Sequence, residues 1–345
     1  MKKKVLATLN KCYSIAPLKY MNEDYILVAS EKNDPCYLFD LEGNVIATIW
    51  DEPGGTMSMT QVSDSNGIFL ATQKFYSPDD SIYSEIDIVY PTELFKWQTQ
   101  KLCHLPFIHR FGILKTPKEN YLIACTIKSS HTFIGDFSTG GKIFAAPLPK
   151  DILNIKEPFR FNVIKDELYH NHGFYIIHRP EGDFALTSSD EGVFKVEPPS
   201  SERTDWEISR LIEDPTSDAT LCDLNGDGKD ELITISPFHG NKLKIYELDE
   251  NNKYQLKYQH PDSMPFLHAI WTDKIDNKPC VVLGYREGEQ ELLQLIFDTE
   301  SHSYKCNCLD KHCGPANAFI YHNKGKDVII SANREIDEVA MYTSE

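Results

Sequence analysis

Short runs of apolar and β-branched residues recur along the whole chain and predict β-strands. They read YILVAS, GIFLAT, YLIACTI, FYIIH, ELITIS, CVVLGY and DVIISA, and each is followed by a turn and a second strand. No long amphipathic helix competes with this pattern, since residues 149–156 and 199–210 would form at most one or two turns. The pattern therefore predicts an all-β protein built from repeated strand pairs.

The strand pairs repeat at a regular distance. Aligning the segment just before each run gives a column of residues separated by 51, 63, 46, 50 and 49 positions. The members of this column are Ser58, His109, His172, Asp218, His268 and Asn317. A period of about 49 divides the chain into about seven units, and a four-stranded propeller blade takes about 40–50 residues. The longest gap accommodates an insertion near residues 147–168. The sequence predicts a seven-bladed β-propeller of four-stranded antiparallel blades, with residues 1–345 as one domain.

The two ends of the chain predict how the ring closes. The final repeat ends at residues 338–345 with only three clear strands. The N-terminal segment KKVLATLNKCY can provide the missing outer strand, which would join the first and last blades and remove an open sheet edge.

Composition and charge narrow the function classes. The formal net charge of −17 disfavours binding to nucleic acid or to an anionic membrane, both of which require clustered Lys and Arg. The basic N-terminus precedes an apolar run too short for a signal peptide, and no run approaches the length of about 18 residues that spans a membrane. Nine cysteines, mostly inside apolar strands, are typical of reduced thiols. We expect a cytoplasmic protein.

The segment DLNGDGKDELITIS combines an acidic loop with a strand. Its oxygen-bearing side chains have the short spacings that a hard cation requires, and Gly226 and Gly228 let the backbone fold around an ion. These side chains belong to Asp223, Asn225, Asp227 and Glu231. The loop predicts a structural Ca²⁺ or Mg²⁺ site. Two other segments, residues 63–67 and 272–278, are degenerate copies of it.

This loop and the following PFHG resemble known propeller repeats. The loop resembles the D-x-D/N-x-D-G repeat of integrin-type and bacterial FG-GAP propellers, and residues 237–240 resemble the propeller domain of aldos-2-ulose dehydratases. The first resemblance implies a cation bound on the blade, away from the ligand mouth. The second implies elimination of water from an oxidised sugar.

The aligned column predicts a site on the propeller axis. Loops that enter the innermost strands open on the same face as the turns between second and third strands, so His109, His172 and His268 should converge there. The second class of turn contributes Lys74, His131, Asp190, His239, Arg286 and Arg334 with Glu335. Several neutral imidazoles can hold a transition metal with an open position. We expect His109, His172 and His268 as metal ligands or acid–base groups.

The remaining residues of the two loop classes suit a sugar ligand. His239 and His131 are candidates for proton transfer, and Arg286 and Arg334 for stabilising a developing anion. Lys74, Asp190 and Asn317 can bind hydroxyl groups, and aromatic residues such as Trp271 can stack on a sugar ring. The competing interpretation is a polar mouth whose histidines only hydrogen-bond neighbouring loops.

CNCLDKHCG, at residues 306–314, allows two interpretations. Cys306, Cys308, His312 and Cys313 could form a zinc site, or they could be incidental thiols on an outer strand. No G-x-S-x-G elbow, Walker loop or dinucleotide fingerprint is present.

Two functions remain open on the sequence. The first is a metal-assisted lyase that dehydrates a ketosugar or an anhydro-ketose by removing a proton next to a carbonyl group. The second is a non-catalytic propeller module that binds a glycan or a protein partner on the same face.

Overall fold

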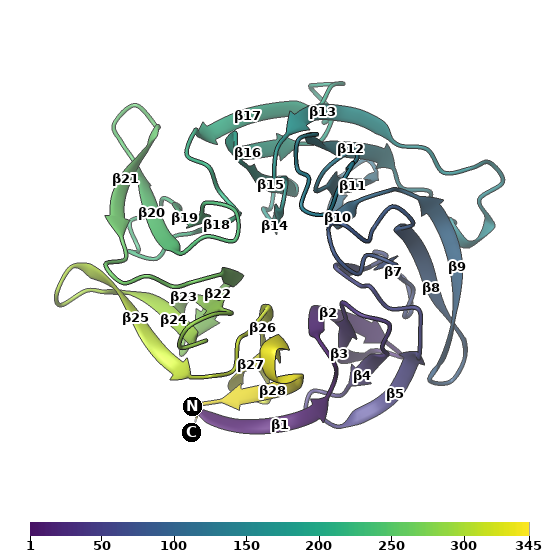
Figure 1. Cartoon of the computed structure of the whole chain (residues 1–345), viewed down its shortest axis with the longest axis horizontal. Helices are drawn as coiled ribbons and strands as arrows, with labels where there is room; N and C mark the ends of the chain where they lie inside the picture. Colours follow the sequence, from purple (N-terminus) through teal and green to yellow (C-terminus); the bar gives the residue numbers. More distant parts are fainter. Residues whose placement is uncertain (345) are drawn as a thin grey trace.

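Seven four-stranded antiparallel sheets surround a central axis in the computed structural model, which describes residues 1–344 (Figure 1). We number these sheets as blades 1 to 7 in chain order. The predicted all-β, seven-bladed propeller is confirmed. The only helical segments in the described residues are two 3₁₀ turns, η1 (Ile152–Asn154) and η2 (Arg334–Ile336). The stretch 199–210, for which at most one or two helical turns were predicted, leads into a strand.

Each blade runs from an innermost to an outermost strand. Blade 1 contains β2 (Cys12–Tyr20), β3 (Glu23–Ser30), β4 (Cys36–Phe39) and β5 (Val45–Trp50). Blade 2 contains β6 (Met59–Gln61), β7 (Phe69–Gln73), β8 (Glu85–Glu93) and β9 (Lys96–His104). Blade 3 contains β10 (Ile108–Lys115), β11 (Asn120–Thr126), β12 (Gly141–Pro147) and β13 (Asn162–Leu168). Blade 4 contains β14 (Gly173–Ile177), β15 (Phe184–Ser189), β16 (Gly192–Glu197) and β17 (Glu207–Ile212).

The remaining blades follow the same order. Blade 5 contains β18 (Asp218–Cys222), β19 (Glu231–Ser236), β20 (Lys242–Leu248) and β21 (Tyr254–Gln259). Blade 6 contains β22 (Leu267–Ile275), β23 (Lys278–Tyr285), β24 (Leu292–Asp298) and β25 (Ser303–Asp310). Blade 7 contains β26 (Asn317–Asn323), β27 (Lys326–Asn333), β28 (Glu338–Thr343) and, as its outermost strand, β1 (Lys2–Thr8).

Strand β1 closes the ring as predicted. It pairs antiparallel with β28 from Lys2 opposite Thr343 to Thr8 opposite Glu338, and the two chain ends meet at this blade (Figure 1). The pairing covers the edge that β28 would otherwise expose, and it ties the first residues of the chain to the last.

The core consists of apolar layers between neighbouring blades. The second strands are almost wholly buried because both of their faces contact adjacent blades; in β19 all six residues of ELITIS are buried. Separate apolar clusters fill each of the seven blade interfaces, and an eighth cluster lies among the loops at one end of the axis. The blades therefore act as wedges that hold the innermost strands around the axis.

Candidate site at the propeller axis

A belt of hydrogen bonds links the innermost strands at one end of the axis. His109 Nδ1 lies 3.2 Å from the His172 carbonyl oxygen, His172 Nδ1 lies 3.1 Å from that of Ser217, and His268 Nδ1 lies 2.7 Å from that of Ala316. Each ring thus bonds to the backbone of the next blade. A carbonyl oxygen only accepts, so each Nδ1 carries the proton and each Nε2 of a neutral ring has a free lone pair.

Close approach of the strands makes this belt possible. Gly173 begins β14 beside β18, and a Cβ at this position would lie 2.6 Å from the Ser217 carbonyl oxygen and 2.8 Å from the Asp218 Cα. Only glycine leaves room for the two blades to approach so closely. The belt gives the column residues a structural role in addition to any chemistry.

Three histidines bring their nitrogens together at the centre. His172 and His268 extend from the starts of β14 and β22, and His239 comes from the loop between β19 and β20. One ligand nitrogen from each lies within 4.8 Å of the other two. His172 Nε2 is buried without a hydrogen-bond partner in the described chain. This is the only cluster of three or more His, Cys, Asp or Glu ligand atoms within residues 1–344, and it could hold a metal ion.

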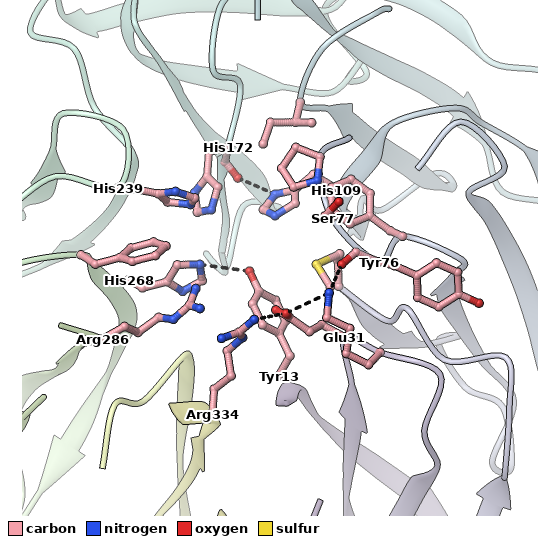
Figure 2. A pocket seen from close by; sticks show the side chains of 16 residues that line it. Tyr13, Glu31, Tyr76, Ser77, His109, His172, His239, His268, Arg286 and Arg334 are labelled. Atoms are coloured by element: carbon pink, nitrogen blue, oxygen red, sulfur yellow. Dashed lines mark hydrogen bonds and ion pairs between the residues drawn. The ribbon is translucent and has the colours of Figure 1, made fainter. Parts of the chain in front are cut away.

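The predicted column of histidines converges at the axis, but one of its residues is not part of the three-histidine cluster. Figure 2 shows His109, His172, His239 and His268 around one cavity. His109 packs against His172 with ring centroids 4.5 Å apart, yet His239 replaces it in the compact cluster. His239 belongs to the second class of loop, where it was expected to act in proton transfer.

These imidazoles are neutral near pH 7. Burial, reinforced by the Arg286 cation, lowers the pKa of His239 to about 3. Burial likewise lowers the pKa values of His109, His172 and His268 well below the usual range, with further contributions from neighbouring arginines and histidines. The expected mutual repulsion of close imidazoles is thus avoided by loss of their protons, which leaves lone pairs for a ligand.

Tyr13 adds a hydroxyl group to the cluster. Its Oη lies 3.1 Å from His268 Nε2 and accepts a hydrogen bond from Arg110 Nη2 at 3.4 Å. Because His268 Nδ1 carries a proton, the Tyr13 hydroxyl donates to Nε2. Burial raises the pKa of Tyr13, which keeps the phenol protonated. The lone pair of His268 is therefore engaged by Tyr13 while no other ligand is present.

An ionic chain forms the wall of the cavity beside blades 6, 7 and 1. Arg286 Nε donates to Glu335 Oε1 at 2.7 Å, and Arg334 Nη1 donates to the same oxygen at 2.8 Å. Arg334 also forms an ion pair with Glu31. The Arg286 guanidinium carbon lies 4.2 Å from the centroid of the Phe266 ring. Both arginines expected in the site therefore reach it, in defined orientations.

The cavity lined by these groups has a volume of about 210 Å³. Every blade contributes at least one lining residue. The lining consists of Tyr13, Glu31, Lys32, Met57, Phe75, Tyr76, Ser77, Pro78, His109, Ile127, His172, His239, Phe266, His268, Arg286 and Arg334. Its volume lies below the range of about 300–1,000 Å³ that is typical for drug-sized ligands, so it suits a smaller molecule.

Five of the residues predicted to act at the axial mouth do not line this cavity. Lys74 forms an ion pair with Glu85, Asp190 bonds to His170 Nδ1 at 2.7 Å, and Asn317 donates to the Tyr13 carbonyl oxygen at 2.8 Å. His131 packs against Phe107. Trp271 lies between Tyr175 and Phe319. Asn317 belongs to the inter-blade belt, whereas Lys74, Asp190 and His131 stabilise their own surroundings at the rim.

The Asp223 loop has a different local structure from the axial site. Asp223 accepts hydrogen bonds from the amides of Gly226 and Gly228 at 2.8 and 3.0 Å, and Asp227 Oδ1 accepts from the amide of Lys229 at 2.8 Å. Asn225 Oδ1 accepts from the amide of Asp227 at 2.8 Å. The loop oxygens therefore accept hydrogen bonds from the loop itself, and its carboxylates do not form a compact three-ligand cluster.

Glu231 faces the interior of the same loop. Its carboxylate accepts from the amide of Leu224 at 2.7 Å and from the side chain of Asn225 at 2.6 Å. Burial raises the pKa of Glu231 to about 7 despite these donors. The side chain supports the turn between β18 and β19, and the cation predicted here stays a prediction.

The four candidate zinc ligands of residues 306–314 are dispersed. Cys306 packs beside the cluster between blades 5 and 6, Cys308 is exposed, and Cys313 is buried in the cluster between blades 6 and 7. The thiol of Cys313 contacts the Gln290 carbonyl oxygen at 3.4 Å. They do not form a ligand cluster with His312 in the described chain, which favours the interpretation as incidental thiols.

Tyr13, Glu31 and Arg110 are site residues that sequence reasoning missed. Tyr13 lies 45 positions before Ser58, by subtraction, and so occupies the column position of blade 1. The repeat period could have found it, had the alignment been extended towards the N-terminus. Arg110 directly follows His109 in β10, but its turn towards Tyr13 has no signal in the sequence.

Comparisons with known proteins support the fold alone. No protein-family model matches the chain, and no curated protein matches it. Among solved structures, the β-propeller domain of Cps50 (Swd1) from Myceliophteria thermophila is similar, with a TM-score of 0.61 and 10% identity over 100% of both chains. The Dos1 propeller is similar with a TM-score of 0.53 and 8% identity, over 92% of this chain and 75% of that one.

The comparisons thus define the class of the protein as a seven-bladed β-propeller, without a match that identifies an FG-GAP family. No helix within residues 1–344 is long and apolar enough to cross a membrane.

Proposed function

We propose that this propeller is a binding module for a small polar ligand, which it holds in the axial cavity on a divalent transition metal. The single observation that carries this proposal is the cluster of three neutral imidazoles, His172, His239 and His268, at the wall of the axial cavity. Three histidines with an open fourth position are the ligand set of many zinc sites. The cavity has a volume of only about 210 Å³, which favours a small molecule over a protein partner.

The arrangement around the imidazoles also suits a metal. The Nδ1 protons of His172 and His268 point to backbone carbonyl groups, which fixes the ring orientation and leaves Nε2 as the ligand atom. A zinc–nitrogen bond of about 2.0–2.1 Å requires the three rings to move inward from their present spacing. His239 lies on a loop, and its ring packs against Phe238 and Phe266, with centroids 3.9 and 4.3 Å away, so it can slide between these rings towards the other two histidines.

Metal analysis tests the proposal directly. Protein purified without chelator, or reloaded with Zn²⁺, should contain about one equivalent of metal per chain by mass spectrometry. His239→Ala should weaken zinc binding by at least about 100-fold, because two imidazoles rarely retain a metal that three hold. His104→Ala, on exposed outer strand β9, is the matched control and should bind zinc like the wild type. Wild-type protein that takes up no stoichiometric Zn²⁺, Co²⁺ or Ni²⁺ would refute the metal site.

A metal-assisted sugar lyase is the second candidate function. The observation that favours it is the hydrogen bond between Tyr13 and His268, since a phenol paired with a neutral imidazole can exchange a proton with a substrate in the cavity. A bound divalent metal would polarise a substrate carbonyl group. Arg286 and Arg334 would stabilise the anion that forms when a proton leaves the neighbouring carbon.

Turnover distinguishes the two candidates. Zinc-loaded protein is incubated with ketosugars and anhydro-ketoses, and loss of water is followed by mass spectrometry. The lyase requires dehydration that Tyr13→Phe abolishes while zinc remains bound. Ligand binding without any dehydration supports the binding module.

A further inference from the structure

We infer that Arg286 binds the carboxylate group of a small organic acid in the axial cavity, beside the imidazole cluster. This inference deepens the proposed function by naming the ligand class, and it rests on that function only for the statement that the cavity binds a ligand.

The Arg286 side chain is held on two sides. Its Nε donates to Glu335, the ring of Phe266 packs against the guanidinium plane, and only 9% of the residue is exposed. The two terminal nitrogens, Nη1 and Nη2, have no hydrogen-bond acceptor within residues 1–344. Figure 2 shows this guanidinium group beside His268, at the wall of the cavity. A fixed guanidinium with two unused donors is prepared for an acceptor.

Charges at the cavity wall do not balance. Lys32, Arg286 and Arg334 face Glu31 and Glu335, so three cations share two carboxylates. The four histidines are neutral and do not change this balance. Each cation has an ion-pair partner, but the wall carries an excess of one positive charge in a protein whose overall net charge is −17. An anionic ligand would balance this excess.

Arg110 is a further cation near the cavity, and it does not reduce the excess of positive charge at the wall. It directs its Nη1 and Nη2 to neutral acceptors, the Met57 carbonyl oxygen and the Tyr13 hydroxyl, both at 3.4 Å. Asp218, whose pKa burial raises to about 7 although the Arg110 cation lowers it, does not line the cavity. A divalent metal on neutral imidazoles would add two further positive charges. The cavity is therefore more favourable to an anion when the metal is present.

The shape of the free donors favours a carboxylate. Two guanidinium nitrogens match the two oxygens of a planar carboxylate in a bidentate pair. Phosphate has the same property, but the cavity also contains Met57, Phe75, Ile127 and Phe266. These apolar groups would contact the carbon skeleton of an organic acid and would have no partner on an inorganic ion.

The experiment compares carboxylates with their own amides. Acetate, lactate and glycerate, each beside the corresponding amide, and inorganic phosphate are titrated into wild-type protein by calorimetry. Every titration is done twice, with protein freed of metal by a chelator and with zinc-loaded protein. We expect at least one carboxylate to bind at least about tenfold more tightly than its amide and than phosphate, because a hydrogen-bonded charge pair is lost in the amide.

Variants assign the effect to Arg286. Arg286→Gln should reduce carboxylate affinity at least about tenfold, and Arg286→Lys should reduce it less, because the charge remains while the paired donors are lost. Arg210→Gln, on the outer strand β17 where Arg210 pairs with Glu213, is the control and should bind like the wild type. Thermal unfolding confirms that each variant is folded. The comparison of acids with amides uses the wild-type protein alone. It therefore tests the inference even if Arg286→Gln does not fold well.

Several results would overturn the inference. They are equal binding of all acids and amides, tighter binding of phosphate than of any carboxylate, and unchanged carboxylate affinity in folded Arg286→Gln. A protein that does not bind zinc would refute the proposed metal site but not this inference. In that case the metal-free protein would still prefer carboxylates, and the preference would depend on Arg286. Zinc binding without any preference for carboxylates would retain the proposed metal and reject the anion site.

Discussion

The axial imidazole cluster and the Asp223 loop both contain residue types that bind cations. They differ in the hydrogen bonds that their ligand atoms already form. At the axis, His172 and His268 use one ring nitrogen to bond to the next blade and direct the other to the cavity. In the loop, Asp223 and Asp227 accept hydrogen bonds from amides two to five residues further along the chain. At the axis the Nε2 lone pair of His172 has no partner and that of His268 accepts from Tyr13, whereas the loop carboxylates accept from the amides of their own turn.

The difference arises from the partners that each region can reach. Side chains at the axis meet the backbones of other blades, which have carbonyl groups at fixed positions and few spare donors. A tight turn instead has its own amides exposed, and short carboxylates bond to them readily. A pattern of ligand-type residues therefore indicates a cation site only if the surrounding backbone leaves the ligand atoms free.

Acidification should have the largest effect, through the axial histidines. Their pKa values lie below the usual value of about 6.5, so the unfolded state takes up more protons as pH falls below 6.5 and the folded state loses stability. Each such histidine lowers the free energy of unfolding by about 1.4 kcal/mol per pH unit in that range. The free energy of unfolding, measured by urea denaturation between pH 7.5 and 5, should depend less steeply on pH in His239→Gln than in the wild type. The difference should equal the contribution of one histidine. A slope identical to that of the wild type would mean that His239 is not buried in neutral form.

Glu231 should respond to pH in the opposite direction. Its pKa is raised to about 7 in the fold, so the folded state keeps a proton that the unfolded state has lost, and stability falls as pH rises from about 4.5 to 7. Between pH 5 and 8, the free energy of unfolding of Glu231→Gln should improve relative to the wild type by about 2–3 kcal/mol. If saturating Ca²⁺ removed this pH dependence from the wild type, the loop would hold a cation near Glu231 after all.

Replacing Tyr13 by Phe should increase the zinc affinity of the axial cluster. The hydroxyl of Tyr13 engages His268 Nε2, so its removal frees a third lone pair for a metal. Zinc affinity should rise about two- to tenfold, in line with a net hydrogen-bond contribution of about 0.5–1.5 kcal/mol. Competition with a chromogenic chelator measures this change. Weaker zinc binding in a folded Tyr13→Phe protein would show that the phenol supports the metal site and does not compete with it.

The smallest effect is expected from Asp227→Ala in the loop. The exposed Asp227 makes one hydrogen bond to the amide of Lys229, and its loss should change the free energy of unfolding by about 1 kcal/mol or less. Thermal melts with and without Ca²⁺ should be nearly the same for both proteins. A Ca²⁺-dependent rise in the melting temperature that Asp227→Ala abolishes would establish the structural cation that the sequence predicts.

The sequence by itself determined the fold of this protein. Apolar runs with a period of about 49 residues, without helices between them, specify four-stranded repeats whose strands are buried between neighbouring blades. The incomplete last repeat and the N-terminal run predicted closure by β1, which the pairing of Lys2 with Thr343 confirms. These features follow from the periodicity of apolar residues, which can be seen directly in the sequence.

The composition of the site was predictable only in part. The column position in each repeat placed His109, His172 and His268 at the axis, because equivalent positions in equivalent blades face the same centre. It could not show that His239 from a different loop would replace His109 in the compact cluster. That exchange depends on the path of the loop between β19 and β20, which no periodicity records.

Only the tertiary structure decided which donors and acceptors remain unused. Arg286 and Arg334 are equivalent in sequence, yet Arg334 is neutralised by Glu31 from blade 1 and by its neighbour Glu335, whereas Arg286 keeps two free nitrogens. Residues 31 and 334 are 303 positions apart. Such partnerships form only when the ring closes, so the availability of a charge or a lone pair is a property of the assembled propeller.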